Sequence, residues 1–453
     1  MYKMKNPYRP SDIIARFPTW TYADFEWRAW QICHKLQQDN IKSVAVWLED
    51  GAHLACTLLA AWQAKVRVLF LPNFTEESVQ WANENADLWI SDSPLEQPNT
   101  VLFSEFTLDS DIEKQPENRL LFEFSNQTEL WLKTSGSSGE AKTIIKTAEQ
   151  MWLSAQVLAD ELPFAADNNV SAVSTVSIQH IYGLTVHIMM SLVQGWIIGR
   201  KQLFFPECVA GESDKSDKTL LISSPAMLTR MDWQHINLPK VIGIISSGGA
   251  LAEEVSDQIR ACLNQPVIEI YGSTETGPIA VRQDTGLWRT LPYSQVGTDE
   301  RGALWLEAKW ATDRQQTADA VEIYPQGFAL LGRIDRIVKI GDKRTSLVSV
   351  EQNLVKHNWI NDCYIAQHPQ LQRLVAWAEL SAQGIEIYKT QGRKYVVAQL
   401  KQHLAHTQDR TALPRFWRFT DKLPRNSQSK ISRSDFERIC ADKQPDYFNQ
   451  CTE

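Results

Sequence analysis

Apolar and polar residues follow each other in regular blocks along the first part of the chain. The runs 43–48 and 66–71 are almost wholly apolar, which is typical of strands buried on both faces. Between them, residues 52–64 place leucines and a tryptophan on one face at helical spacing. A second helix is predicted over 75–86 and a further strand over 87–91. Strands that alternate with helices predict a parallel sheet covered by helices.

The same order recurs in the middle of the chain. Residues 240–250 predict a buried strand, 251–263 a helix, and 267–272 another strand. Beyond about residue 335 the expected strands are short and alternating, and the helices are few. The pattern therefore predicts an α/β large N-terminal domain with parallel-type sheets, followed by a small α+β C-terminal domain.

Composition narrows the class of protein. The 453 residues are 43% hydrophobic and 22% charged, and the net charge of −8 is spread without long runs. A nucleic-acid partner is not expected, because such partners select basic surfaces. None of the 7 cysteines stands in C-x-x-C spacing, so neither a zinc site nor a redox pair is indicated. Scattered free thiols favour a reducing compartment.

The chain shows no predicted targeting or membrane segment. Residues 1–17 lack the apolar core of a signal peptide, and the most apolar stretch, 187–199, is short and interrupted. We therefore expect a cytoplasmic protein without a membrane span.

Residues 134–142, "TSGSSGEAK", form a glycine- and hydroxyl-rich turn that ends in a lysine. A Walker loop requires glycine directly before that lysine, and here the residue is Ala141. Without a Walker loop, the stretch is either a phosphate cradle of another kind or a mobile surface loop. Taken alone, the residues leave these two alternatives equal.

A second polar segment follows a buried strand. Residues 271–275, "YGSTE", combine an aromatic ring, a tight glycine turn and an acid. Ligands of open α/β sheets bind at the carboxyl ends of the strands, where this segment is predicted to lie. Further along, Asp319, the pair Gly332-Arg333, and Lys430 in a polar loop supply charge.

Together these motifs resemble those of the adenylate-forming superfamily, which includes acyl- and aryl-CoA ligases, nonribosomal adenylation domains and luciferase. Its loop T-S-G-S-[ST]-G-x-P-K matches 134–142 except at the proline, and its Y-G-x-T-E matches 271–275 in full. The family's S-G-G-A, T-G-D, G-R-x-D and P-R-x-x-x-G-K motifs correspond, in family order, to residues 247–250, 317–319, 332–335 and 424–430.

The resemblance implies a two-step reaction. A carboxylate would attack the α-phosphorus of ATP, with Mg²⁺ as cofactor, to give an acyl-adenylate and pyrophosphate. The acyl group would then pass to the phosphopantetheine thiol of coenzyme A or of an acyl carrier protein. The implied domains are a large AMP-binding domain, 1–333, and a small mobile lid domain, 334–453, with a hinge near Asp335.

The resemblance also implies the site residues. Those that would contact the nucleotide through a hydroxyl, a charge, a ring or exposed backbone are Thr134, Ser135, Gly136, Ser137, Ser138, Gly139, Lys142, Gly248, Gly249, Ala250, Tyr271, Gly272, Asp319 and Arg333. Those implied in catalysis are Lys430, Thr274, Glu275 and His180. Glu275 would help to hold Mg²⁺, Tyr271 would stack on adenine, and Lys430 would bridge the substrate carboxylate and the α-phosphate.

Some assignments keep an alternative. His180 would line the acyl pocket or thiol channel, but a buried, hydrogen-bonded histidine fits equally well. Asp335 could be an ordinary salt-bridge partner, and a lysine such as Lys430 is often only solvated. A non-catalytic or regulatory nucleotide-binding relative is the alternative for the whole chain, although the retained charged residues favour an enzyme.

The departures from the family pattern affect the substrates. Ala141 replaces the loop proline and Ala318 replaces a glycine. Asp342 follows Gly341 where the small domain would face the thiol path, so its carboxylate would oppose coenzyme A phosphates and favour a carrier protein. The acid is expected to be an aryl acid or a short to medium acyl chain. Its pocket walls would include Gln179, His180, Ile181, Tyr182, Ser246 and Gly272.

Overall fold

A computed structural model describes residues 6–107, 127–134, 142–164, 166–167, 169–283, 286–340, 343–371, 373–408, 410–425, 431–442 and 446–447. Contacts divide the chain into two compact units. Unit 1 comprises Met1–Gly297, Trp305–Gln315 and Tyr324–Phe328, and unit 2 comprises Thr298–Leu304, Gln316–Ile323 and Ala329–Glu453. The predicted domain boundary after residue 333 and the hinge near Asp335 remain predictions.

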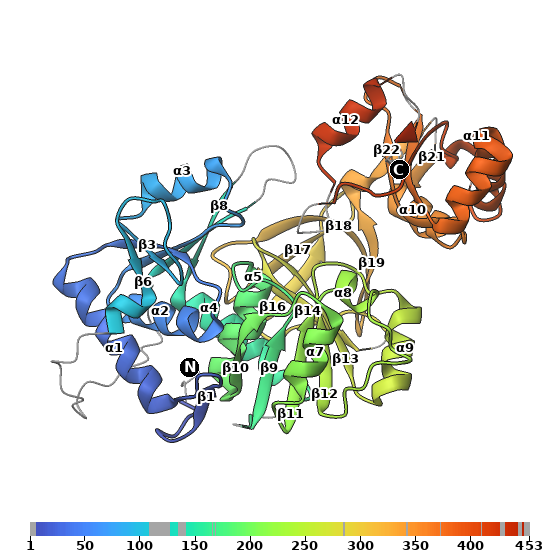
Figure 1. Ribbon diagram of the computed structural model, residues 1–453. Coiled ribbons are helices and arrows are strands. Elements are labelled where there is room, and N and C mark those ends of the chain that lie inside the picture. Colours follow the sequence, from blue (N-terminus) through green and yellow to red (C-terminus); the bar gives the residue numbers. More distant parts are fainter. Residues whose placement is uncertain are drawn as a thin grey trace, which may run out of the picture. The chain divides into compact units, whose positions relative to one another are not determined.

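The first sheet of unit 1 contains the strands predicted near the N-terminus (Figure 1). Its order is β6 (Thr100–Leu102), β5 (Leu88–Ser91), β3 (Ser43–Trp47), β4 (Arg67–Phe70), β7 (Glu129–Lys133) and β8 (Thr143–Thr147). Neighbouring strands are parallel except β7 and β8, which pair antiparallel on either side of the predicted phosphate loop.

The second sheet of unit 1 is larger. Its order is β15 (Arg289–Thr290), β14 (Gly277–Gln283), β13 (Val267–Ser273), β12 (Val241–Ser246), β11 (Lys218–Ser223), β9 (Val170–Ser174), β10 (Ile197–Gln202), β1 (Ile13–Ala15) and β2 (Trp20–Thr21). The strands from β13 to β1 are parallel to their neighbours, and antiparallel strands close both edges.

The helices of unit 1 cover these sheets. They are α1 (Tyr22–Gln38), α2 (Gly51–Gln63), α3 (Glu76–Asn85), η1 (Phe103–Thr107), α4 (Ala148–Asp160), α5 (Ile181–Gly183), η2 (Leu184–Met189), α6 (Met190–Gln194), α7 (Pro206–Ser213), α8 (Pro225–Leu228) and α9 (Glu253–Leu263). Figure 1 shows α2 and α3 on opposite sides of β3. Accordingly, Val46 packs in the core that contains Leu58 of α2, whereas Ala45 packs with Ala82 of α3. Burial on both faces explains the unbroken apolar run in the sequence.

Downstream strands build two further sheets and a hairpin. One sheet has the order β16 (Ser294–Thr298), β17 (Ala303–Ala308), β18 (Gln315–Tyr324) and β19 (Gly327–Arg333). The hairpin is β20 (Ile337–Ile340) with β21 (Lys343–Ser346), after the turn η3 (Ile334–Arg336). The other sheet has the order β22 (Ile360–Gln367), β23 (Leu374–Leu380), β24 (Phe416–Thr420) and β25 (Asp446–Tyr447).

Helices cover both faces of the last sheet. They are α10 (Leu347–Val355), α11 (Ala382–Ala405), η4 (Arg410–Ala412) and α12 (Arg433–Ala441). Ala376 of β23 packs with Leu400 of α11, whereas Trp377 packs with Phe436 of α12. The strand β23 is therefore buried on both sides and does not alternate as expected. The predicted fold class, a large α/β domain and a smaller α+β domain, is confirmed. In the part of the chain that the structure describes, no helix has the length and apolar character needed to cross a membrane.

One buried histidine affects how unit 1 responds to pH. The Nε2 of His187 lies 3.1 Å from the carbonyl oxygen of Ala172, and its Nδ1 has no hydrogen-bond partner among the described residues. Burial lowers the pKa of His187 from 6.5 to about 4, although the bond to Ala172 acts in the opposite direction. The folded protein therefore holds this imidazole neutral.

A pH-dependent loss of stability follows. The unfolded chain takes up this proton near pH 6.5 and the folded protein only near pH 4, so the contribution of His187 is complete above pH 6.5. Below that pH it should fall by about 1.4 kcal/mol per pH unit, until the folded protein is also protonated. His187→Gln keeps an N–H donor without a titrating group, so its urea-unfolding free energy should fall less steeply. Parallel pH curves for the two proteins would contradict this role.

Candidate active site

The two ends of the predicted phosphate loop are joined by backbone and hydroxyl groups. The amide N–H of Thr134 donates to the carbonyl oxygen of Lys142 at 2.8 Å. The Thr134 hydroxyl lies 3.2 Å from the same oxygen and also accepts from the Lys142 amide at 3.2 Å. These bonds close the base of the loop between β7 and β8. The expected residues Ser135, Gly136, Ser137, Ser138 and Gly139, together with Ala141, Asp342 and Lys430, lie outside the described residues.

Tyr271 lies near the end of β13 in an aromatic group. Its ring centroid is 5.5 Å from that of Trp288 and 5.8 Å from that of Phe328, and both rings are inclined to it. Trp288 and Phe328 are themselves paired through two backbone hydrogen bonds of 2.9 and 3.0 Å. Tilted contacts at these distances are favourable for aromatic rings and limit the movement of Tyr271. Neither Trp288 nor Phe328 was predicted from the sequence as part of the site.

The turn after β12 is fastened beside Tyr271. The hydroxyl of Ser247 donates to the carbonyl oxygen of Ile270 at 2.7 Å. Gly248 has φ +86° and a Cβ there would meet nothing within 4 Å, so the space over this backbone is open. Bare backbone of this kind allows close approach of a ligand, and stacking of adenine on Tyr271 remains a prediction.

Glycine is also required on the Tyr271 side of the site. A Cβ at Gly272 would lie 2.3 Å from the carbonyl oxygen of Gly277, on the antiparallel partner strand β14. Any side chain would therefore force the two strands apart at the end of the hairpin. This close approach explains the glycine that follows the tyrosine in the motif.

Thr274 and Glu275 occupy the turn between β13 and β14. The turn is closed by mutual bonds between Ser273 and Thr276, at 2.9 and 3.2 Å from amide to hydroxyl. Glu275 is exposed and Thr274 is half-buried. Among the described residues, no group of three His, Cys, Asp or Glu side chains could hold a metal ion. A single carboxylate still suits Mg²⁺, which commonly takes its other ligands from nucleotide phosphates and water.

Lys146 is a residue of this region that the sequence analysis missed. It lies on β8, is only 5% exposed, and donates from Nζ to the backbone carbonyl oxygen of Glu275 at 2.6 Å. Burial lowers the pKa of Lys146 from 10.5 to about 8, while the charge of Glu275 acts in the opposite direction. Only its position in "TIIKT", on the strand that leaves the loop, could have drawn attention to it.

Two expected nucleotide ligands lie in unit 2. Arg333 Nη1 is 3.8 Å from Asp319 Oδ1, and the two residues stand on β19 and β18. The Asp319 amide donates to the Thr317 hydroxyl at 3.1 Å, and that hydroxyl donates to the Leu304 carbonyl oxygen at 2.8 Å. The carboxylate and guanidinium expected to contact the nucleotide are thus neighbours within this unit.

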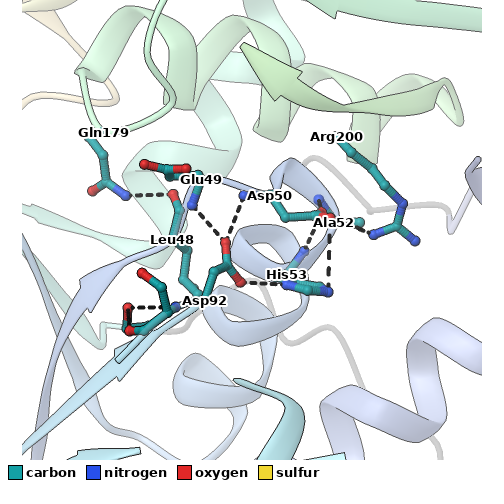
Figure 2. A network of polar contacts seen from close by, with 10 residues as sticks. Leu48, Glu49, Asp50, Ala52, His53, Asp92, Gln179 and Arg200 are labelled. Atoms are coloured by element: carbon teal, nitrogen blue, oxygen red, sulfur yellow. Dashed lines mark hydrogen bonds and ion pairs between the residues drawn. The ribbon is translucent and has the colours of Figure 1, made fainter. Parts of the chain in front are cut away.

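The expected acid pocket contains residues whose polar ends contact backbone. Gln179 is buried and donates from Nε2 to the Leu48 carbonyl oxygen at 2.8 Å (Figure 2). The Tyr182 hydroxyl lies 2.9 and 3.0 Å from the carbonyl oxygens of Ser223 and Ile245. These contacts hold the segment that carries the half-buried His180 at the start of α5.

Comparison with known proteins identifies the family. A family model described as "AMP-binding enzyme" matches residues 6–302. The 4-chlorobenzoate–CoA ligase of Arthrobacter sp is 22% identical over 344 residues, and the match covers 66% of this chain and 64% of that protein. The 2-succinylbenzoate–CoA ligase of Bacillus pumilus is 20% identical over 464 residues, covering 93% of each chain.

Solved structures show the same fold. The o-succinylbenzoate CoA synthetase of Bacillus subtilis, in complex with its acyl-adenylate intermediate, aligns with a TM-score of 0.80 at 16% identity, covering 94% of this chain and 96% of that chain. ATP-bound MatB of Rhodopseudomonas palustris aligns with a TM-score of 0.79 at 17% identity, covering 95% and 96%. The family match, the motifs in their order and the shared fold agree: the chain belongs to the AMP-binding enzymes of the adenylate-forming superfamily.

Proposed function

We propose that this protein is an acid–thiol ligase that uses ATP to convert a carboxylic acid into an acyl-adenylate. The observation that supports this most strongly is that the open backbone of Gly248 follows a bond from Ser247 to Ile270, next to Tyr271, while Glu275 stands in the turn after β13. Adenine would lie against the ring and bare backbone, and Glu275 would help to hold the magnesium of MgATP. Since two anions must meet, the site acts mainly by positioning them and neutralising charge.

The proposed acid is an aryl acid. The names of relatives support this class, since they include a 4-chlorobenzoate ligase and a 2-succinylbenzoate ligase. A short or medium acyl chain is the alternative within the same reaction.

The proposed acceptor is the thiol of phosphopantetheine, on coenzyme A or on an acyl carrier protein. Relatives named as CoA ligases support coenzyme A. The carboxylate of Asp342 in the sequence motivates the carrier protein instead. Parallel thioester assays with the two acceptors, after the acid is known, would decide between them.

A pyrophosphate-release assay with a panel of aryl and acyl acids tests the first step. At least one acid should give Mg²⁺-dependent release that is absent without the acid. If none of the acids causes pyrophosphate release although ATP binding is measurable, the ligase proposal is overturned. That result would favour a regulatory nucleotide-binding protein.

Tyr271→Ala should weaken ATP binding by about tenfold, the scale of one base-stacking contact. Tyr271→Phe keeps the ring and should bind ATP nearly as well as the wild type. Calorimetric titration with ATP measures both, and Tyr395→Ala, an exposed tyrosine on α11, provides a control. Equal affinities for Tyr271→Ala and the wild type would exclude stacking on this ring.

A further inference from the structure

We infer that Lys146 is a positioning residue of the ATP–magnesium site, which fixes the turn bearing Glu275 to the strand that leaves the phosphate loop. The inference rests on the proposed function, because it assigns a role toward MgATP. Lys146 is set apart from most lysines by its burial: 5% of its surface is exposed. A buried ammonium group is costly unless it is hydrogen-bonded, so its partner is held firmly.

The partner of Lys146 lies far away in the sequence. Its Nζ donates to the Glu275 carbonyl oxygen at 2.6 Å, across 129 residues. The contact joins β8 of the first sheet to the β13–β14 turn of the second. A charged donor to a backbone carbonyl gives a strong, short hydrogen bond, and here it fixes the peptide rather than the carboxylate.

The same turn is supported from another direction. Gly277, with φ +68°, follows it, and a Cβ at Gly277 would lie 3.1 Å from Trp310 Cδ1. The hydroxyl of Thr276, which is buried, donates to the Gly277 carbonyl oxygen at 2.7 Å. The main chain on the C-terminal side of Glu275 is thus packed, whereas the Glu275 side chain is exposed. Lys146 supplies the contact to the Glu275 peptide itself.

The strand β8 begins directly after the loop. Lys142, at the end of the loop, stands four residues before Lys146 on the same extended segment, and its carbonyl oxygen accepts from Thr134. The segment therefore bonds to Thr134 at one end and to the Glu275 peptide at the other. This short span therefore links Thr134 and Lys142, at the two ends of the loop, to the turn that bears Glu275.

Lys146→Met removes the donor and keeps an unbranched apolar stem. The half-saturating Mg²⁺ concentration for ATP binding should rise about tenfold, the low end of the effects seen when a group supporting a metal ligand is lost. Calorimetric ATP titrations at several Mg²⁺ concentrations measure this without turnover. In the pyrophosphate assay, the apparent Mg²⁺ requirement should rise in parallel while the KM for the acid stays unchanged. Lys146→Arg keeps a charged donor and should restore most of the Mg²⁺ affinity.

Lys133→Met is the matched control. Lys133 is 9% exposed on the neighbouring strand β7 and also donates to a carbonyl oxygen, that of Glu77, at 2.9 Å. Both substitutions should lower the melting temperature, but only the change at Lys146 should alter the Mg²⁺ dependence. If Lys146→Met does not fold, Lys146→Gln, which is polar but one bond shorter, should give the same Mg²⁺ shift.

The outcomes separate the inference from the proposed function. A Mg²⁺ dependence unchanged in Lys146→Met, or changed equally in Lys133→Met, would overturn the positioning role and leave the ligase intact. If the wild-type protein releases pyrophosphate with none of the acids in the panel, the ligase proposal is overturned. The binding titration would then still report whether Lys146 supports the MgATP site.

Discussion

Replacing Lys430 with alanine is expected to lower kcat for acyl-adenylate formation by about 100-fold, the scale for losing one preorganised electrostatic contact. The lysine stands at the end of the segment 424–430, which matches the P-R-x-x-x-G-K motif except for Ser429. If its charge is used only while the carboxylate meets the α-phosphate, the affinity for ATP should change little. Pyrophosphate release under saturating ATP and acid measures the effect.

The control for this prediction is another lysine close by in the sequence. Lys422 is exposed, so Lys422→Ala should adenylate at the wild-type rate. Thiol transfer from supplied acyl-adenylate should also survive in Lys430→Ala, because no pyrophosphate leaves in that step. Near-normal adenylation by Lys430→Ala would remove the lysine from the mechanism.

Asp50→Ala is expected to lower the free energy of unfolding of unit 1 by about 3 kcal/mol, the low end for breaking a buried ion pair. Arg200 Nη1 lies 3.0 and 2.8 Å from the two carboxylate oxygens of Asp50 (Figure 2). The Arg200 side chain is 6% exposed and that of Asp50 19%. Removing the carboxylate would leave the guanidinium buried without its counter-charge.

The rest of Arg200 is held in place by neighbouring chain. Its Nε and Nη2 donate to the carbonyl oxygens of Arg16 and Pro18, at 3.0 and 2.8 Å. The guanidinium carbon lies 4.4 Å from the centroid of the Trp20 ring. These contacts prevent the group from swinging into solvent when Asp50 is lost, so the unpaired charge cannot be avoided.

Asp50 has a second role that can be separated from the ion pair. Its Oδ1 accepts from the amides of Ala52 and His53 at 2.8 and 3.2 Å, which caps α2. Asp50→Asn keeps a capping oxygen and should be more stable than Asp50→Ala by about 1 kcal/mol. Both variants lose the charge, so both should be clearly less stable than the wild type in urea unfolding.

An exposed ion pair provides the comparison. Asp39 lies 3.2 Å from Lys35, and both side chains are about half exposed, at 45% and 53%. Asp39→Ala should therefore change the unfolding free energy by less than about 0.5 kcal/mol. A similar small loss for Asp50→Ala would show that water already screens the Arg200 pair.

Much of the fold follows from patterns that are local in the chain. The runs predicted as strands at 43–48, 66–71 and 87–91 are β3, β4 and β5, and the helix predicted over 52–64 is α2. Apolar runs and helical spacing show which faces of a short segment are buried in a core. These elements could therefore be predicted without knowing which other segments they pack against. The limits differ by at most one residue at each end, as is usual at fraying ends.

The motif segments of the candidate site were predictable for the same reason. Tyr271 lies near the end of a buried strand, and Thr274–Glu275 form a turn because a tight glycine, Gly272, and small polar residues stand together there. Their proposed roles came from the family resemblance, and remain predictions for experiment. A backbone position that only glycine can occupy is visible in the sequence as a glycine.

What the local pattern could not supply is which distant residues meet. Lys146 is an ordinary lysine between Ile145 and Thr147, and only the turn at Glu275, 129 residues away, makes it an interior residue. Arg200 and Asp50, 150 residues apart, are also ordinary charged residues until the strand β10 lies beside the start of α2. The burial of a charge depends on the partner that compensates it. That partner is selected by the packing of the two sheets, and no short stretch of sequence contains it.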